Sequence, residues 1–147
     1  MRRAEYMTEA HDPKTLTVLK IMEDAVFTCS PRTPGATVAQ LLAERNFGSV
    51  PVVEEGMTLL GLISEFDLLK AMTDGKNLQS VTAVEIMTHE NDLVTVTEDM
   101  PIMDLAKLLQ ETHLIRVPVV RGKTLVGIVA RRDIVFGYVK AVANYWP

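Results

Sequence analysis

Apolar and polar positions follow the same order twice along this chain of 147 residues. In each half, apolar side chains recur at helical spacing, first over TVAQLLAE (37–44) and again over DLAKLLQE (104–111). This spacing predicts two amphipathic helices, each with one apolar face. An apolar, β-branched VPVV run follows in both halves, at 50–53 and at 117–120, and predicts a buried strand. The two halves therefore share one order of elements.

A second strand and a second helix are expected after each VPVV run. A polar turn separates the two strands, as in a hairpin. The second strand runs into GLISEFDLL (61–69) in the first half and GIVARRDIV (127–135) in the second, and a helix is expected to begin near Asp67 and Asp133. With a short leading strand, each half reads β-α-β-β-α. The leading strands are expected at 26–29 and 94–96, and the second strands at 59–63 and 124–129.

The two halves form an internal repeat, because matching positions stay in order at a nearly constant offset. Ile21 matches Ile86, Val50 matches Val117, and Gly61 matches Gly127 in this alignment. A unit of about 60 residues buries only about 60% of its unfolded surface, so we expect the repeats to pack on each other. We assign 1–16 to an N-terminal arm, 17–73 to repeat one, 74–80 to a linker, 81–142 to repeat two and 143–147 to a C-terminal tail.

Composition and charge narrow the class of protein. With 48% hydrophobic and 23% charged residues, the chain has the make-up of a globular protein. The net charge of −4 gives no general attraction to nucleic acid or to an anionic membrane. Binding of single-stranded nucleic acid through the basic second repeat is further disfavoured by an aromatic content of 5%. The longest apolar runs are too short to cross a bilayer, so we expect a cytoplasmic protein without a membrane partner.

Catalytic signatures are lacking in the sequence. The single cysteine, Cys29, cannot form an internal disulfide, and its strand-like surroundings favour a buried inert thiol over a nucleophile. The stretch HEND (89–92) gathers candidate metal ligands, but no second histidine is in register with it. No glycine-rich phosphate loop and no nucleophile–histidine arrangement is present. We therefore predict a protein that is not an enzyme, with no metal and no required cofactor.

The repeated motifs carry a resemblance to a known family. Each half begins with the pattern hxxIM, where h is a hydrophobic residue and x is any residue: TVLKIM (17–22) in the first half and TAVEIM (82–87) in the second. The VPVV strand follows, and then the turn G-h-h-S-x-x-D or its variant. This ordered pair resembles a tandem cystathionine-β-synthase-type (CBS) domain pair, often called a Bateman module, and the chain looks like a stand-alone member. The resemblance covers about residues 17–140. It implies an α+β fold of two β-α-β-β-α CBS repeats packed with pseudo-two-fold symmetry, with mixed sheets flanked by helices.

The resemblance also implies a function. Family members commonly bind adenosine-containing ligands in clefts between the repeats, namely AMP, ADP or ATP and, in some members, NAD or S-adenosylmethionine. Such modules usually regulate an attached enzyme or channel, and family members usually pair through helices beside the clefts. We therefore expect a regulatory ligand-sensing module that forms a homodimer and signals to an unidentified protein. The alternative is a dimerisation or scaffold module that uses the same fold and binds no nucleotide.

Two aspartates match the family position that binds ribose. A carboxylate at Asp67 or Asp133 can accept hydrogen bonds from both hydroxyls of a ribose diol. The alternative for Asp67 is helix capping, because Ser64 and Asp67 have the spacing of a capping box. In the second repeat Ala130 replaces the serine, so Asp133 lacks this capping partner and ribose binding is favoured there.

Phosphate contacts are expected to differ between the repeats. The resemblance assigns phosphate binding to Ser64 in the first repeat and to Arg116 in the second, with Arg131 and Arg132 adding positive charge beside Asp133. Since each cleft of the family mixes residues from both repeats, the sequence leaves open which cleft Arg116 faces. We expect one tight site and one weak or empty site.

The remaining residues that the resemblance places in the clefts lie on predicted strands and turns. The alternative for those on strands is that they are ordinary core residues, and for the serines and threonines that their hydroxyls only stabilise turns. His113, at the end of a predicted helix, is more typical of a C-terminal cap than of a ligand contact. The resemblance assigns the adenine edge and cleft lining to Thr28, Ser30, Val50, Pro51, Thr95, Thr97, Val117 and Pro118.

Overall fold

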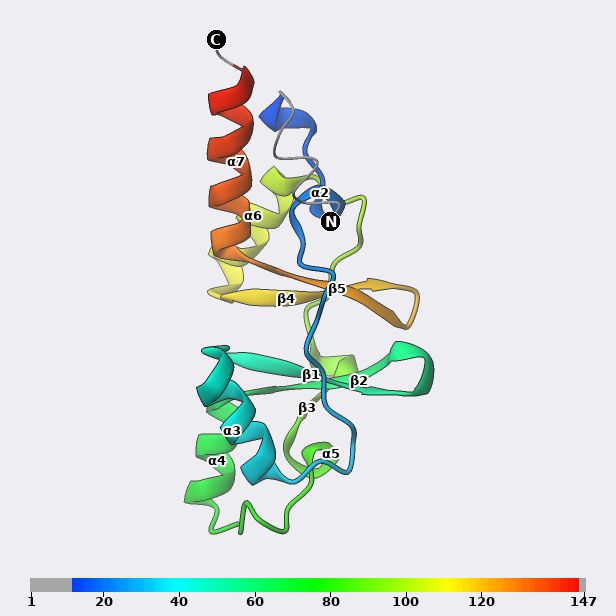
Figure 1. Ribbon diagram of the computed structural model, residues 1–147, viewed down its shortest axis with the longest axis vertical. Coiled ribbons are helices and arrows are strands. Elements are labelled where there is room, and N and C mark those ends of the chain that lie inside the picture. The colour runs from blue at the N-terminus through cyan, green and yellow to red at the C-terminus, as the bar shows by residue number, and fades with distance from the viewer. Residues whose placement is uncertain (1–11, 146–147) are drawn as a thin grey trace. The chain divides into compact units, whose positions relative to one another are not determined.

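The computed structural model describes residues 12–145, so residues 1–11 of the expected arm and 146–147 of the expected tail lie outside the described residues. The chain folds into two compact units. The α4 unit comprises residues 27–93 and 123–125, and the α7 unit comprises the described residues before 27, together with 94–122 and 126–145. Each unit is named after the helix that directly follows its hairpin of two strands (Figure 1).

The α4 unit is built on an antiparallel hairpin with helices packed against it. Strand β1 (Ser49–Glu54) pairs with β2 (Thr58–Ser64), with Val50 opposite Ile63. Helices α3 (Gly35–Arg45) and α4 (Glu65–Thr73) cover one face of this hairpin (Figure 1), and Val38, Leu42 and Leu68 join the strands in one buried core. The short elements are η2 (Glu55–Met57), α5 (Ala83–Ile86), β3 (Thr88–His89), which pairs antiparallel with β2, and η3 (Glu90–Asp92).

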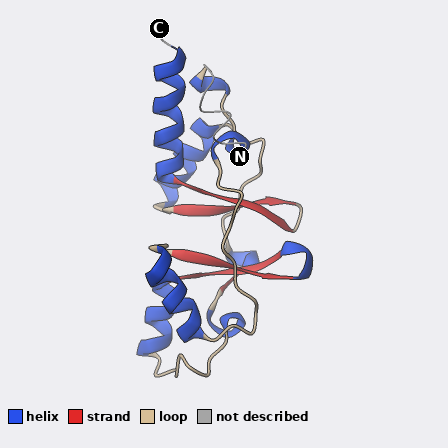
Figure 2. Cartoon of the chain, in the orientation of Figure 1, coloured by secondary structure: helices blue, strands red, loops and turns tan. Residues whose placement is uncertain are grey.

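The α7 unit repeats this arrangement, as the colouring of strands and helices in Figure 2 shows. Strands β4 (Arg116–Arg121) and β5 (Thr124–Ala130) are hydrogen-bonded neighbours, followed by the long helix α7 (Arg131–Tyr145). Helix α6 (Ile102–Thr112) precedes them and ends at His113, which adopts the left-handed conformation of a C-cap. The predicted capping role of His113 is therefore confirmed. The unit also contains η1 (Pro13–Thr15) and α2 (Val18–Ile21).

The leading helical turn of each repeat packs into the core of the other repeat's unit. Val18 and Ile21 of α2 belong to repeat one, yet they are fully buried in the core that contains Ile102. The backbone holds this segment in place, since the Val18 N–H donates to the Met100 carbonyl oxygen at 2.9 Å. In the same way, Ala83 of α5 is buried in the core of the α4 unit. The compact units therefore have boundaries different from those of the sequence repeats at 17–73 and 81–142.

The expected leading strands are reduced to single bridges. Cys29 bridges Val52 and Val96 bridges Val119, both in parallel orientation. The Cys29 N–H donates to the Pro51 carbonyl oxygen at 2.9 Å, but the chain then turns, because the Ser30 N–H donates to the Thr33 hydroxyl. The predicted positions are right, and the turn explains why the pairing at Cys29 does not extend into a strand.

Two matching glycines allow a close approach of the backbone within each unit. A Cβ atom on Gly127 would lie 2.7 Å from the Met22 sulfur, and one on Gly61 would lie 2.5 Å from both the Met87 sulfur and the Thr88 carbonyl oxygen. Both distances are shorter than van der Waals contact. Close packing of Met22 on Gly127 and of Met87 on Gly61 thus explains why the G-h-h-S motif begins with glycine.

Replacing Gly127 by alanine is expected to lower the free energy of unfolding by about 1–3 kcal/mol, because the added methyl group overpacks this contact. Urea denaturation followed by circular dichroism measures the change. Gly48→Ala is the matched control, since a Cβ at Gly48 meets its nearest neighbour, a Glu65 carboxylate oxygen, at an ordinary 3.7 Å. Equal losses in both variants would contradict the packing explanation.

Candidate functional site

The N-terminus of α4 carries a carboxylate that is held by its own helix cap. Ser64 is the N-cap, and its hydroxyl accepts from the Asp67 N–H at 3.2 Å. In return, Asp67 Oδ2 accepts from the Ser64 N–H at 2.9 Å and from the Ser64 hydroxyl at 3.0 Å. This is the capping box expected as the alternative for these two residues, and it is confirmed. The cap leaves Asp67 half-buried at the start of the helix.

Thr88 completes this cluster and was not singled out from the sequence. Its hydroxyl lies 3.1 Å from Asp67 Oδ1 and 3.3 Å from Asp67 Oδ2, although the two residues are 21 positions apart. Thr88 is positioned by β3, where it pairs with Leu62 of β2. The sequence signal is its place directly after the IM of TAVEIM, the same place that Glu23 takes after TVLKIM.

Ser49 adds a further polar group on the paired strand. It is the first residue of β1, it is 4% exposed, and it pairs with Ser64 in the sheet register. Paired residues on adjacent strands place their side chains on the same face. The Ser49 hydroxyl is buried without a hydrogen-bond partner among the described residues. A buried hydroxyl without a hydrogen-bond partner is energetically unfavourable, so a polar group of a ligand would be stabilised beside it.

The N-terminus of α7 carries the matching carboxylate in a different setting. Asp133 is 7% exposed, and its Oδ2 accepts from the Ala130 N–H at 2.9 Å. Ala130 supplies no hydroxyl, and Glu23 stands where the other unit has Thr88. The position is equivalent because Glu23 pairs with Ile128, as Thr88 pairs with Leu62. The aspartate predicted to bind ribose is therefore present in both units, with different neighbours.

Arg116 lies beside Asp133. It is the first residue of β4, the position that Ser49 has in β1. Burial lowers the pKa of Arg116, and the negative charge of Asp133 opposes this decrease. The two segments also meet through the backbone, because the Arg131 N–H donates to the Ile115 carbonyl oxygen at 2.9 Å. Arg116 belongs to the α7 unit, as Asp133 does, whereas Asp67 belongs to the α4 unit.

The residues predicted to contact adenine have little side-chain surface to offer a ligand. Val50 and Val117 are 0% and 1% exposed, so their side chains belong to the two cores. Pro51 and Pro118 are buried, and each carbonyl oxygen accepts from a leading-segment N–H, Cys29 in one unit and Val96 in the other. Any ligand contact at these four positions would be through backbone atoms or the proline rings.

The predicted cleft hydroxyls fall into two groups. Thr28 and Thr95 are half-buried in the leading segments. Ser30 and Thr97 are exposed and take part in turns, because the Ser30 hydroxyl hydrogen-bonds Thr33 and the Thr97 hydroxyl donates to Asp99. The alternative of turn hydroxyls therefore describes Ser30 and Thr97.

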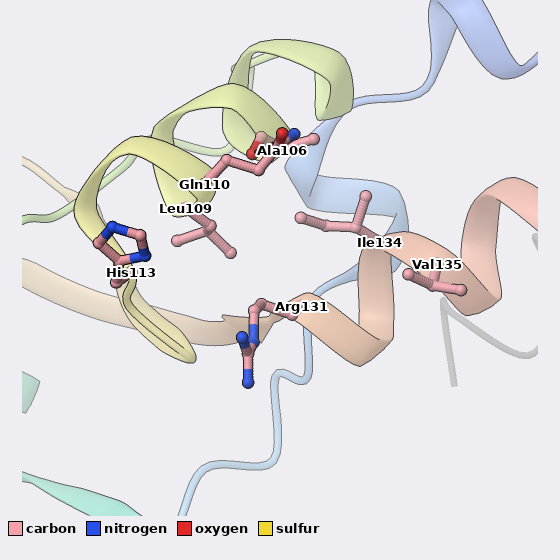
Figure 3. Close-up of a pocket in the computed structure, with 7 residues that line it drawn as sticks. All are labelled: Ala106, Leu109, Gln110, His113, Arg131, Ile134 and Val135. Carbon is pink, nitrogen blue, oxygen red and sulfur yellow. Dashed lines mark hydrogen bonds between the residues drawn. The ribbon is translucent and has the colours of Figure 1, made fainter.

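Arg131 and Arg132 are exposed in the first turn of α7. Arg131 lines a groove between α6 and α7, together with His113 (Figure 3). Of the predicted phosphate-binding residues of repeat two, Arg116 is half-buried, whereas Arg131 and Arg132 are exposed.

Other candidate chemistry is limited in the described part of the chain. Within residues 12–145 there is no cluster of three or more His, Cys, Asp or Glu side chains that could hold a metal ion. The HEND stretch forms the turn η3, in which His89 Nδ1 accepts from the Asn91 N–H. Cys29 is buried as predicted, and burial raises the pKa of its thiol to about 11. No described helix is long and apolar enough to span a bilayer.

Comparison with known proteins identifies the family. The CBS domain model matches residues 18–74 and 83–140, so the chain belongs to the CBS domain family and carries a tandem pair. An uncharacterized protein of Methanopyrus kandleri is 35% identical over 124 residues, which cover 82% of this chain and 62% of that protein. The mitochondrial CBS domain-containing protein CBSX3 of Arabidopsis thaliana is 32% identical over 97 residues, covering 64% of this chain and 47% of that protein. The chain thus spans about half to three fifths of the length of these curated relatives.

Solved structures share the fold. CBSX2 in complex with AMP is 28% identical, with a TM-score of 0.74, and the match covers 84% of this chain and 96% of that one. The CBS domain pair of protein MJ0100, in complex with 5′-methylthioadenosine and S-adenosyl-L-methionine, is 30% identical, with a TM-score of 0.71, covering 84% and 97%. The predicted CBS-pair fold with mixed α and β elements is therefore confirmed.

Proposed function

We propose that this chain is a regulatory module, without catalytic chemistry of its own, that binds an adenosine-containing ligand and signals its presence to a partner protein in the cytoplasm. The observation that carries the proposal is the pair of Asp133 and Arg116 at the start of α7 and β4, in a chain that belongs to the CBS family. The bound AMP, 5′-methylthioadenosine and S-adenosylmethionine of the related structures support this ligand class.

Asp133 and Arg116 have complementary tasks in this proposal. A carboxylate is acceptor-only and can take protons from both hydroxyls of a ribose. A guanidinium matches the oxygens of a phosphate or carboxylate in two-pronged fashion. Partial burial strengthens both interactions because the local dielectric constant is low. The α7 unit is therefore the proposed tight site for a ligand that carries an anionic group on its ribose.

The α4 unit is proposed as the weaker site. The Asp67 carboxylate already accepts from Ser64 and from Thr88, and a ribose diol must compete with these donors. Ser49 replaces the arginine, so this unit supplies no cation at that position. Because the arginine is replaced, this unit is proposed to take an uncharged adenosine derivative in preference to a nucleotide. A ligand can regulate a partner only as far as its affinity differs between two arrangements of the protein.

A thermal-shift panel tests the proposal. Its ligands are AMP, ADP, ATP, NAD, 5′-methylthioadenosine and S-adenosylmethionine, with GMP as the control for the base. A ligand present at about 100 times its dissociation constant should stabilise the fold by roughly 2.7 kcal/mol, which corresponds to a rise in Tm on the order of 5–10 °C. The expected result is a rise with at least one adenosine ligand and none with GMP. No rise with any ligand at millimolar concentration would contradict the proposal and favour the scaffold alternative.

A further inference from the structure

Glu23 occupies, in the α7 unit, the backbone position that Thr88 occupies in the α4 unit. The Glu23 N–H donates to the Ile128 carbonyl oxygen at 2.8 Å, and the Ile128 N–H donates to the Glu23 carbonyl oxygen at 2.9 Å. Thr88 pairs with Leu62, which matches Ile128 in the repeat alignment. Paired residues place their side chains on the same face of a sheet. The Glu23 side chain therefore leaves the backbone on the side that Thr88 occupies in the other unit.

The matching glycines of the two units support this equivalence independently. A Cβ atom on Gly127 would lie 3.0 Å from the Glu23 carbonyl oxygen, and one on Gly61 would lie 2.5 Å from the Thr88 carbonyl oxygen. Each carbonyl oxygen thus lies close against the glycine of its own unit. The backbone is placed alike at Glu23 and Thr88, so the difference between the two positions lies in the side chain.

The aspartate of each unit is also held in the same way. Asp133 Oδ2 and Asp67 Oδ2 each accept, at 2.9 Å, from the N–H of the residue three positions earlier. In the α4 unit the Thr88 hydroxyl lies 3.1 Å from Asp67 Oδ1. A side chain at the Thr88 position therefore acts directly on the carboxylate that is proposed to bind ribose. The matching positions of the α7 unit are Glu23 and Asp133.

Glutamate changes the chemistry of this position. A threonine hydroxyl is neutral and can donate to an aspartate, whereas a carboxylate only accepts hydrogen bonds and carries a negative charge. Glu23 is half-buried, and its Oε1 accepts from the Ala25 N–H at 3.1 Å, which fixes the side chain on the turn that follows α2. A charge that is partly shielded from water acts more strongly on its surroundings than a fully exposed one. Glu23 thus adds negative potential to the α7 unit where the α4 unit has a neutral donor.

The added carboxylate affects which charges a ligand can carry. The site of Asp133 has one half-buried guanidinium at the start of β4, that of Arg116, which can bind one anionic group in two-pronged fashion. Arg131 and Arg132 are exposed in the first turn of α7, where water and salt screen their charges. A second carboxylate at Glu23 therefore favours a positive group elsewhere on the same ligand.

We propose that Glu23 is a specificity-determining residue of the α7 unit, which selects an adenosine derivative with both a positive and a negative group over a nucleotide whose charges are all negative. This role rests on the proposed function, because it concerns the ligand of the same site. The negative group contacts Arg116, the ribose contacts Asp133, and Glu23 attracts the positive group and repels the remaining charge of a phosphate. S-adenosylmethionine has the selected combination of charges, since it carries a carboxylate, an ammonium group and a sulfonium, whereas AMP carries only a phosphate.

Titration calorimetry of the tight site with S-adenosylmethionine and with AMP tests this role. Glu23→Gln keeps the shape of the side chain and an acceptor for the Ala25 N–H, but it removes the charge. Glu23→Thr copies the residue of the α4 unit. In both variants, S-adenosylmethionine is expected to bind more weakly and AMP more tightly, so that the ratio of the two affinities shifts toward AMP by at least about tenfold. AMP binding that appears only in the variants would also support the proposal.

Asp24→Asn is the matched control for this experiment. It removes one negative charge from the next residue, which is exposed, so the affinity ratio should stay within about twofold of the wild type. The Tm of each variant shows that the fold is intact. An equal shift in Asp24→Asn would overturn the proposal, because the effect would then come from net charge alone.

The same titrations separate failure of this role from failure of the proposed function. If the ligands bind and both Glu23 variants change the affinity ratio by less than about twofold, the role of Glu23 is overturned and the proposed function stands. If neither ligand gives heat of binding with the wild type or with either Glu23 variant at millimolar concentration, the proposed function is overturned, and the role of Glu23 with it.

Discussion

Replacing Ile21 by alanine is expected to lower the free energy of unfolding by about 3 kcal/mol. Ile21 is 0% exposed and packs in the core of the α7 unit with Ile102, although it lies about 80 positions earlier in the sequence. Removing a large aliphatic side chain from such a core typically costs about 2–5 kcal/mol, through lost burial and the cavity that remains. Urea denaturation followed by circular dichroism measures the loss.

The control for Ile21→Ala is Asp24→Ala. Asp24 follows the same helical turn but is exposed, so its replacement should change the free energy of unfolding by less than about 0.5 kcal/mol. A loss below about 1 kcal/mol in Ile21→Ala would contradict the exchange of leading segments between the repeats. It would mean that α2 rests loosely on the α7 unit instead of completing its core.

Replacing Asp133 by asparagine is expected to weaken ligand binding at the tight site by about ten- to a hundredfold. Asparagine has nearly the same shape, but it loses the negative charge and cannot accept through both side-chain atoms. A hydrogen bond to a charged group is worth about 1.5–3 kcal/mol, which gives this range of affinity. Titration calorimetry measures the affinity, and the Tm of each variant shows that the fold is intact.

The matched variant is Asp67→Asn. It makes the same chemical change at the start of α4, where the carboxylate is engaged by its capping box and by Thr88. It is expected to leave the tight site within about threefold of the wild type and to lower the free energy of unfolding by roughly 0.5–1.5 kcal/mol, because the capping box loses its charged acceptor. Equal losses of affinity in Asp133→Asn and Asp67→Asn would show that the two units are functionally equivalent.

The regular elements could be predicted from the sequence because the physical signals are local. The helical spacing of TVAQLLAE falls within α3 and that of DLAKLLQE falls within α6, and the β-branched VPVV runs lie in β1 and β4. The capping box at Ser64 was also readable, since it depends on two residues three positions apart. Within one element, sequence spacing largely determines which side chains are neighbours.

The exchange of α2 and α5 could not be predicted, because it depends on which core a four-residue helix enters. TVLKIM and TAVEIM have the same apolar pattern, and either would fit either core by that pattern alone. The contact of Thr88 with Asp67 was missed for the same reason, since it exists only after α5 has entered the α4 unit. Likewise, the sequence identified Arg116 and Asp133 separately, and only the fold of the α7 unit brings them together.

The most direct test of the proposed function is calorimetric titration of the wild-type chain with AMP and, in parallel, with S-adenosylmethionine. We expect one tight site per chain for at least one of the two ligands, and a second site that is at least tenfold weaker or silent. The asymmetry follows from Arg116 beside Asp133 in one unit and from Ser49 in its place in the other. Two equal sites per chain, or no heat of binding for either ligand at millimolar concentration, would contradict it.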